Sequence, residues 1–312
     1  MSITAFVFPG QGSQSIGMLS DLSDRFPLII EIFDKVSEHL KFDVWQLVQS
    51  GPEDILNQTE HTQVAMLVAD VAIYNVLEQQ GLASATMMAG HSLGEYAALV
   101  CSGSLNLLDA AALVKKRGQL MQEFVPLGQG AMAAIVGLTD DDVRTVCTKA
   151  SSETELVSPA NYNSIGQVVI AGHTSAVEKA INIANEMGAR MAVLIPVSVP
   201  CHCMLLKEAA DEFLHALNST EFLVPKLPVI SNVDLSTYKS SSEIRGLLQK
   251  QLYSPVRWVE TIEVMKKSNV ELIIECGPGK VLTSLIKRID RSLQTLSVND
   301  PSSFDNLAAL NN

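Results

Sequence analysis

The chain has 312 residues, 47% hydrophobic and 18% charged, a balance typical of a soluble protein with a sizeable core. Its formal net charge of −12 argues against nucleic acid as a ligand. No apolar stretch approaches the roughly 20 residues that cross a bilayer, and the N-terminus does not resemble a signal peptide. Five scattered cysteines make a poor disulfide framework. Together these features favour a cytoplasmic protein with reduced thiols.

The first 126 residues predict strands and helices in alternation, as expected for an α/β domain. An apolar strand over residues 4–8 runs into the glycine-rich loop 9–14. The apolar spacing then predicts helical segments, which are 21–48 with a break near Phe42, 62–80 and 109–124. Between the last two, residues 85–89 predict a buried strand and residues 95–100 the start of a helix.

Residues 127–198 predict six elements in the order β-α-β-β-α-β, which is typical of a ferredoxin-like unit. They are a strand 130–138, a helix 139–149, strands 156–162 and 167–171, a helix 173–187 and a strand 190–197. We therefore expect a small domain inserted into a larger one. After Pro200 the larger fold resumes with a helix 204–217, strands 228–231, 271–275 and 294–298, and a helix opened by 277–280.

A Gly-x-Ser-x-Gly pattern lies between the strand at 85–89 and the helix that follows it. It is filled by Gly90, His91, Ser92, Leu93 and Gly94. Strand, sharp turn and helix are the context in which this pattern makes a nucleophile elbow, because the glycines permit a turn too tight for side chains. The turn would place the Ser92 hydroxyl at a helix N-terminus, where negative charge is stabilised. The alternative is an ordinary strand-to-helix turn with Ser92 as an N-cap.

A serine nucleophile needs a base, and in elbow folds the histidine follows the serine in the chain. Of the three candidates, His173 and His215 resemble surface positions, whereas His202 lies where the inserted unit returns to the main fold. His202 is therefore the candidate base, against the alternative of a loop histidine with local partners. No Asp or Glu stands out by spacing as the third member, and a backbone carbonyl could orient the histidine instead.

Arg117 is the second residue of interest, because a guanidinium binds a carboxylate bidentately and a lysine cannot. Gly118, directly after it, lowers helix propensity and suggests a close approach by another segment. The alternative is a surface arginine in the basic run 115–117, on a solvated helix face. The same alternative holds for the basic residues near the C-terminus, which are Lys266, Lys267, Lys280, Lys287, Arg288 and Arg291. Cys201 and Cys203 flank His202 but predict no metal site, since no second ligand pair accompanies them.

Several motifs run in the order found in one enzyme family. They are Phe8-Pro9-Gly10-Gln11-Gly12-Ser13-Gln14, Gly90-His91-Ser92-Leu93-Gly94-Glu95-Tyr96, Lys116-Arg117-Gly118, Asn161-Tyr162-Asn163, Val197-Ser198-Val199-Pro200 leading into His202, Gln251-Leu252-Tyr253 and Glu275-Cys276-Gly277-Pro278-Gly279-Lys280-Val281-Leu282. Over nearly its full length the chain resembles the malonyl-CoA:acyl carrier protein transacylases of bacterial fatty acid synthesis.

The resemblance implies a role for each matching residue. Ser92 would be the acylated nucleophile and His202 its base. The backbone N–H groups of Gln11 and Leu93 would form the oxyanion hole, Arg117 would bind the malonyl carboxylate, and the carbonyl of Gln251 would orient His202. The implied reaction is ping-pong transfer of malonyl from malonyl-CoA to acyl carrier protein, by a monomer that uses no cofactor or metal.

The implied fold is an α/β-hydrolase-like large domain, residues 1–126 plus 199–312, with residues 127–198 as the ferredoxin-like insert. Two departures, Cys201 for a frequent Ser and Ile165 for a frequent Pro, concern fine specificity and not the reaction. Two other functions stay open at this point. One is a serine hydrolase or thioesterase on the same elbow, and the other is a non-catalytic module that binds a carrier protein.

Overall fold

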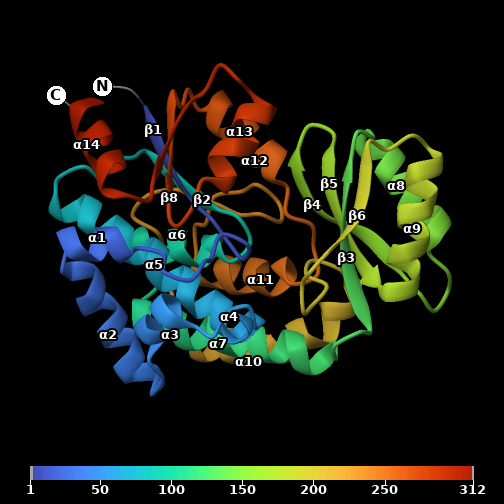
Figure 1. Cartoon of the computed structure of the whole chain (residues 1–312), viewed down its shortest axis with the longest axis horizontal. Helices are drawn as coiled ribbons and strands as arrows, with labels where there is room; N and C mark the ends of the chain where they lie inside the picture. Colours follow the sequence, from blue (N-terminus) through green and yellow to red (C-terminus); the bar gives the residue numbers. More distant parts are fainter. Residues whose placement is uncertain (1–2, 311–312) are drawn as a thin grey trace.

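The computed structural model describes residues 3–310, which form two units side by side (Figure 1). The larger unit is built on a five-stranded parallel sheet in the order β7-β2-β1-β8-β9. Its strands are β1 (Thr4–Phe8), β2 (Met87–Gly90), β7 (Val229–Ile230), β8 (Leu272–Cys276) and β9 (Gln294–Val298). All five lie where the sequence predicts strands, to within two residues at each end.

Helices cover both faces of this sheet, as a parallel sheet requires. Side chains of β1 alternate between two apolar clusters, with Phe6 and Phe8 in one and Ala5 and Val7 in the other. The first cluster includes residues of α2 (Leu28–Leu40), α5 (Thr59–Gln79), α6 (Gly94–Cys101), α7 (Leu107–Phe124), α10 (Lys207–Ser219) and α11 (Ser241–Gln251). The second includes residues of α12 (Trp258–Lys267) and α13 (Val281–Ile289).

The smaller unit has the β-α-β-β-α-β order that the sequence predicts. Its elements are β3 (Gly130–Val136), α8 (Asp140–Ala150), β4 (Val157–Ser164), β5 (Gln167–His173), α9 (Thr174–Glu186) and β6 (Met191–Ile195). The four strands form an antiparallel sheet in the order β4-β5-β3-β6. A capping box of Thr139 and Asp142 begins α8, as the run of polar residues there predicts.

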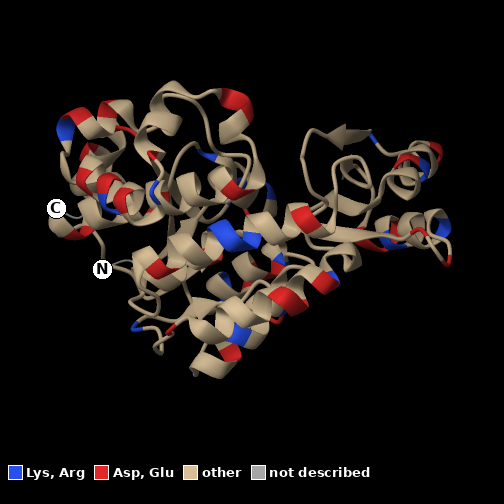
Figure 2. Cartoon of the chain, turned by 90° about the horizontal axis from the view of Figure 1, so that it is seen from below, with Lys and Arg blue, Asp and Glu red and all other residues tan. Residues whose placement is uncertain are grey.

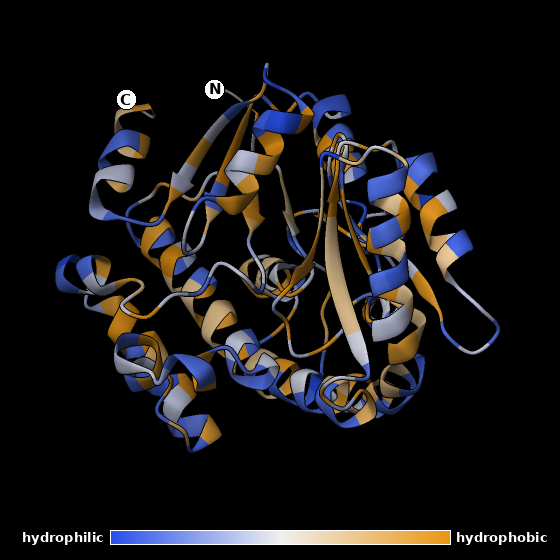
Figure 3. Ribbon diagram, turned by 45° about the vertical axis from the view of Figure 1, so that its right-hand side comes forward, coloured by the Kyte–Doolittle hydropathy of each residue, from blue (hydrophilic) through white to orange (hydrophobic). Residues whose placement is uncertain are grey.

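The two faces of the small sheet have different neighbours. Ala133 and Ile135 of β3 pack with α8 and α9, which lie on the outer side of the molecule (Figure 1). Met132 and Val169 point the other way, into a cluster with residues of the loop after β6. In Figure 3 most helices carry both hydrophilic (blue) and hydrophobic (orange) residues, as expected of helices that have one exposed and one buried face.

The structure differs from the sequence prediction at several helices. The predicted segment 21–48 is three helices, α1 (Ser20–Arg25), α2 and α3 (Val44–Ser50), because Pro27 caps α2 and Lys41 ends it at φ 54°. Four helices were not predicted, namely α4 (Glu53–Leu56), α11, α12 and α14 (Pro301–Leu310). Such helices are stabilised mainly by tertiary packing. In α14, for example, the ring of Phe304 packs on the ring of Phe26, with 4.9 Å between the ring centroids. Within residues 3–310 no helix is both long and apolar enough to cross a membrane.

Candidate active site

Ser92 occupies the sharp turn between β2 and α6, with φ of 52°, in the predicted strand–turn–helix setting. The turn leaves no space for side chains at its two glycines. A Cβ on Gly90 would lie 1.8 Å from the carbonyl carbon of Gly94, and one on Gly94 would lie 2.0 Å from the carbonyl oxygen of Phe8. The glycines of the motif are therefore required by backbone contact and not by loop flexibility.

Asn232, just after β7, fixes this turn from the neighbouring strand. Its Oδ1 accepts from the Ser92 N–H at 2.8 Å, and its Nδ2 donates to the Gly90 carbonyl at 2.7 Å. The Ser92 N–H is therefore occupied. Within residues 3–310, the N–H groups of Leu93 and Gln11 have no acceptor, and both residues border the same cavity as Ser92. Both N–H groups are therefore available to an oxyanion.

The Ser92 hydroxyl and His202 form a hydrogen-bonded pair, with 2.7 Å between Oγ and Nε2. On the other side of the ring, Nδ1 lies 2.7 Å from the backbone carbonyl oxygen of Gln251. A carbonyl only accepts, so Nδ1 carries the proton and Nε2 is free to accept from the serine. This pairing takes the place of the carboxylate that the sequence did not supply.

His202 is 2% exposed and has φ of 61°, on the loop that links the small unit back to the large one. Burial lowers the pKa of this imidazole to about 3, with a further decrease from the charge of Arg117, against the opposing hydrogen bond to Gln251. The ring is therefore neutral at physiological pH, the form in which it can accept a proton.

Arg117 of α7 points into the same site and is only 2% exposed, so the surface-arginine alternative is wrong. Its Nη1 donates to Gln63 Oε1 at 2.9 Å and its Nη2 to Gln251 Oε1 at 3.1 Å. Nη2 also lies 3.5 Å from Ser92 Oγ, and Nε has no partner among residues 3–310. No acidic side chain in that range forms an ion pair with it. The site thus holds a buried cation whose polar partners are all neutral.

The close approach expected at Gly118 is present, and it sets the position of Arg117. A Cβ on Gly118 would lie 2.5 Å from the Cα of Glu60 and 2.7 Å from its N, at the start of α5. Gly118→Ala is expected to destabilise the fold by about 2–3 kcal/mol through overpacking between α5 and α7. Chemical denaturation measures this.

Gly246 in α11 offers a matched control, because a Cβ there meets nothing within 4 Å. Gly246→Ala is expected to stabilise the protein by up to about 1 kcal/mol, the usual gain at an open helix position. Equal stability changes in the two variants would contradict the packing described at Gly118.

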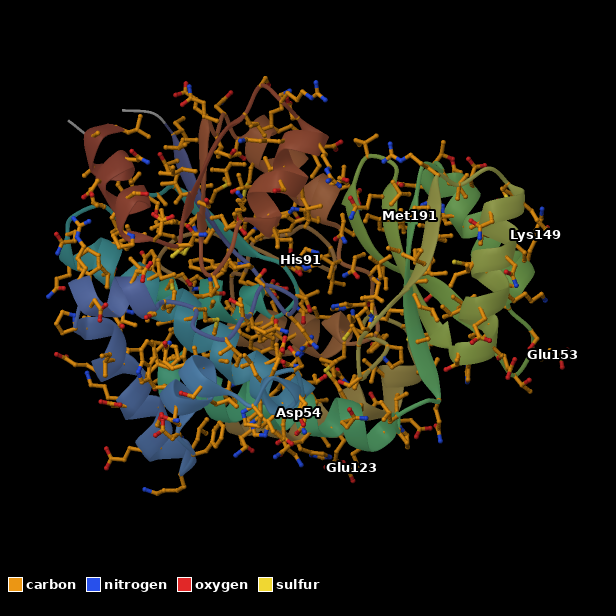
Figure 4. The ribbon with its side chains drawn as sticks, viewed as in Figure 1. Asp54, His91, Glu123, Lys149, Glu153 and Met191 are labelled. Atoms are coloured by element: carbon orange, nitrogen blue, oxygen red, sulfur yellow. The ribbon has the colours of Figure 1, made fainter. Side chains whose placement is uncertain are left out.

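The site is a cavity of about 210 Å³ at the boundary between the two units. The small unit contributes mainly apolar wall, including Met132, Val169 and Ile195, and α13 contributes Leu282 and Leu285. His91 of the turn is hydrogen-bonded to Asn163 of β4, with 2.8 Å between Nε2 and Oδ1. Figure 4 shows His91 near the middle of the molecule, where the two units meet.

Five of the six predicted site residues border this cavity, and the sixth, Gln251, is hydrogen-bonded to His202 from behind. Sequence reasoning missed Gln63 and Asn232, and it gave no role to Glu95 or Asn163. Glu95 and Asn163 lie in motifs that matched the family, but no spacing gave them a role. Gln63 and Asn232 lie in no such motif, and polar residues of their kind are common in helices and loops.

The remaining polar motifs do not form a second centre. The thiols of Cys201 and Cys203 donate to the backbone carbonyls of Val199 and Pro200 at 3.6 and 3.4 Å. Across residues 3–310, no group of three or more His, Cys, Asp or Glu side chains is placed to hold a metal ion. Burial of Arg117 interrupts the basic run 115–117, and Figure 2 shows basic and acidic residues intermixed along the surface helices.

Comparison with known proteins agrees with this geometry. Residues 5–301 match the acyl transferase domain family, so the chain contains an acyl transferase domain. The malonyl CoA-acyl carrier protein transacylase of Escherichia coli (strain K12) is 50% identical over 304 residues, covering 97% of this chain and 98% of that relative. The chain therefore belongs to the malonyl CoA-acyl carrier protein transacylase family.

Solved structures show the same relationship. An acyl carrier protein S-malonyltransferase from Vibrio cholerae is 51% identical with a TM-score of 0.95, covering 98% of this chain and all of the other. PlMCAT:AntF, a type II PKS acyl-carrier protein in complex with its malonyl-transacylase, is 48% identical with a TM-score of 0.97 and full coverage of both chains.

Proposed function

We propose that this protein transfers a malonyl group from malonyl-CoA to the phosphopantetheine thiol of acyl carrier protein. The observation that carries the proposal is Arg117, a buried guanidinium with neutral partners that lies 3.5 Å from the hydroxyl of Ser92. A buried cation of this kind favours an acyl group with a free carboxylate. The names of the relatives support malonyl as that group, and fatty acid synthesis is the pathway that would use it.

In the first half-reaction Ser92 is the nucleophile and His202 the general base. Nε2 of His202 takes the hydroxyl proton as Oγ attacks the thioester carbonyl of malonyl-CoA. The N–H groups of Gln11 and Leu93 stabilise the oxyanion, a contribution typically worth about 3 kcal/mol of barrier for each donor. The C–S bond then breaks, and His202 gives its proton to the departing sulfur, so that coenzyme A leaves as a thiol and the imidazole is neutral again.

The second half-reaction runs the same steps with a different thiol. His202 takes the proton of the phosphopantetheine thiol, and the sulfur attacks the malonyl-serine ester. The C–O bond to Ser92 breaks, and Oγ recovers the proton from His202. Throughout, Nδ1–H donates to the carbonyl of Gln251, which keeps the imidazole in one tautomer. The scheme requires no metal or cofactor.

We infer the fold class of each unit from its sheet. The parallel sheet with its elbow after β2 supports an α/β-hydrolase-like domain, residues 1–126 plus 199–312. The strand order β4-β5-β3-β6, antiparallel throughout, supports a ferredoxin-like insert, residues 127–198. We also propose that the protein is a monomer and that it acts in the cytoplasm.

Intact-protein mass after mixing with malonyl-CoA alone tests the proposal. A malonyl adduct is expected, located by peptide mapping on the segment that contains Ser92. Addition of holo acyl carrier protein is then expected to remove the adduct and to malonylate the carrier.

The two alternative functions give different results in that experiment. Steady release of coenzyme A without carrier and without a lasting adduct would indicate a hydrolase, in which water takes the acyl group. Neither adduct nor release would indicate another acyl donor or a non-catalytic carrier-binding role.

A further inference from the structure

Gln251 does more than present a carbonyl to His202, because its side chain links two charged groups. Oε1 accepts from Arg117 Nη2 at 3.1 Å. Nε2 donates to Glu95 Oε2 at 2.5 Å and to the Ser92 carbonyl at 3.0 Å. The amide therefore lies between the guanidinium in the cavity and a carboxylate behind it.

Glu95 is the third residue after the serine, in the first turn of α6, and it is buried. The hydrogen bonds to its carboxylate all come from donors, namely the Tyr238 hydroxyl, the Gln251 amide and the Asn232 backbone N–H. Burial raises the pKa of Glu95 to about 7, while the hydrogen bonds from Tyr238 and Gln251 oppose that rise. Above that pH the carboxylate is a fixed acceptor.

An amide side chain has two orientations related by a half-turn, and only one of them suits Arg117. With Nε2 toward Glu95, Oε1 faces the guanidinium and accepts from it. In the reverse orientation the amide N–H₂ would face the N–H groups of Arg117, donor against donor, while its oxygen faced an acceptor. The acceptor at Glu95 therefore selects the orientation that holds Arg117 in the cavity.

We infer that Glu95 is a positioning residue for acyl-group selection, which acts through the Gln251 amide to hold Arg117 where it meets the substrate carboxylate. This inference rests on the proposed function, because it takes Arg117 as the group that recognises malonyl. Glu95 itself does not border the cavity and touches no reacting atom.

The test compares malonyl-CoA with acetyl-CoA as acyl donors at pH 8, where Glu95 is ionised. Glu95→Met has a similar length but no acceptor. Its ratio of kcat/KM for malonyl to that for acetyl is expected to fall about three- to tenfold, the usual effect of losing one hydrogen bond, because Ser92 still offers its carbonyl. The fall is expected mainly in KM for malonyl-CoA.

The conservative variant separates positioning from general packing. Glu95→Gln can still accept from Gln251 through its amide oxygen and donate to the Tyr238 oxygen. It is expected to restore the ratio to within about twofold of wild type. Tyr238→Phe removes the hydroxyl that donates to Glu95 but keeps the hydrogen bond between Glu95 and Gln251. It is expected to leave the ratio unchanged.

Each outcome decides the inference. An unchanged ratio in folded Glu95→Met, or an equal fall in Tyr238→Phe, would overturn it. If Glu95→Met does not fold, Glu95→Asp provides the same test, since its carboxylate is withdrawn from Gln251 by one methylene. A wild type that shows no preference for malonyl would instead overturn the proposed role of Arg117, which is a distinguishable result.

Discussion

Ser92→Ala is expected to lower malonyl transfer by about 10⁴- to 10⁶-fold, the range seen when the nucleophile of a serine–histidine pair is removed. The loss follows because the 2.7 Å hydrogen bond from Ser92 Oγ to His202 Nε2 places the proposed nucleophile next to its proposed base. Alanine and serine both carry a Cβ, so the backbone strain at the left-handed φ of 52° is the same in the variant as in wild type. The variant should therefore fold normally.

Steady-state malonylation of acyl carrier protein gives the rate, and intact mass reports the adduct. Ser13→Ala is a matched control, since Ser13 borders the same cavity without contacting the serine–histidine pair. It is expected to keep activity within about threefold of wild type. A malonyl adduct that persists in Ser92→Ala would show that another group carries the acyl chain.

The elbow was predictable because its requirements are local. Two glycines at fixed spacing, a buried strand before them and a helix after them describe the geometry of β2, Ser92 and α6 without reference to the rest of the chain. The loop position of His202 was predictable for a similar reason, since it marks the return from one unit to the other. The same local patterning predicted each of the nine strands in residues 3–310 to within two residues at each end.

The rest of the site depends on contacts between distant segments. Gln63 lies 54 residues from Arg117, and Gln251 lies 156 residues from Glu95. No sequence spacing marks such pairs, because the fold alone brings α5, α6, α7 and α11 together. Arg117 illustrates the difficulty. Its basic run suggested a solvated helix face, yet tertiary packing buries it.

Arg117→Ala is expected to lower kcat/KM for malonyl-CoA by about 10²- to 10³-fold, as when one partner of a buried charge pair is removed. The acetyl group has no free carboxylate that Arg117 could bind, so kcat/KM for acetyl-CoA is expected to change by less than about tenfold. The charge of Arg117 also lowers the pKa of His202. In the variant that pKa rises toward its ordinary value, so both donors should be compared at pH 8, where the imidazole remains neutral.

Competition between the two donors, followed by the mass of the acyl-enzyme, measures the change in preference directly. Lys116→Ala is the matched control, because Lys116 is the exposed neighbour of Arg117 in the same helix, and its variant should keep the malonyl preference. Arg117→Lys should be intermediate, since it keeps a positive charge but lacks the planar fork that binds a carboxylate bidentately. Equal losses for malonyl and acetyl in Arg117→Ala would mean that the guanidinium supports Ser92 and Gln251 but does not select the acyl group. A loss confined to malonyl would establish that the buried guanidinium beside Ser92 sets the substrate of this enzyme.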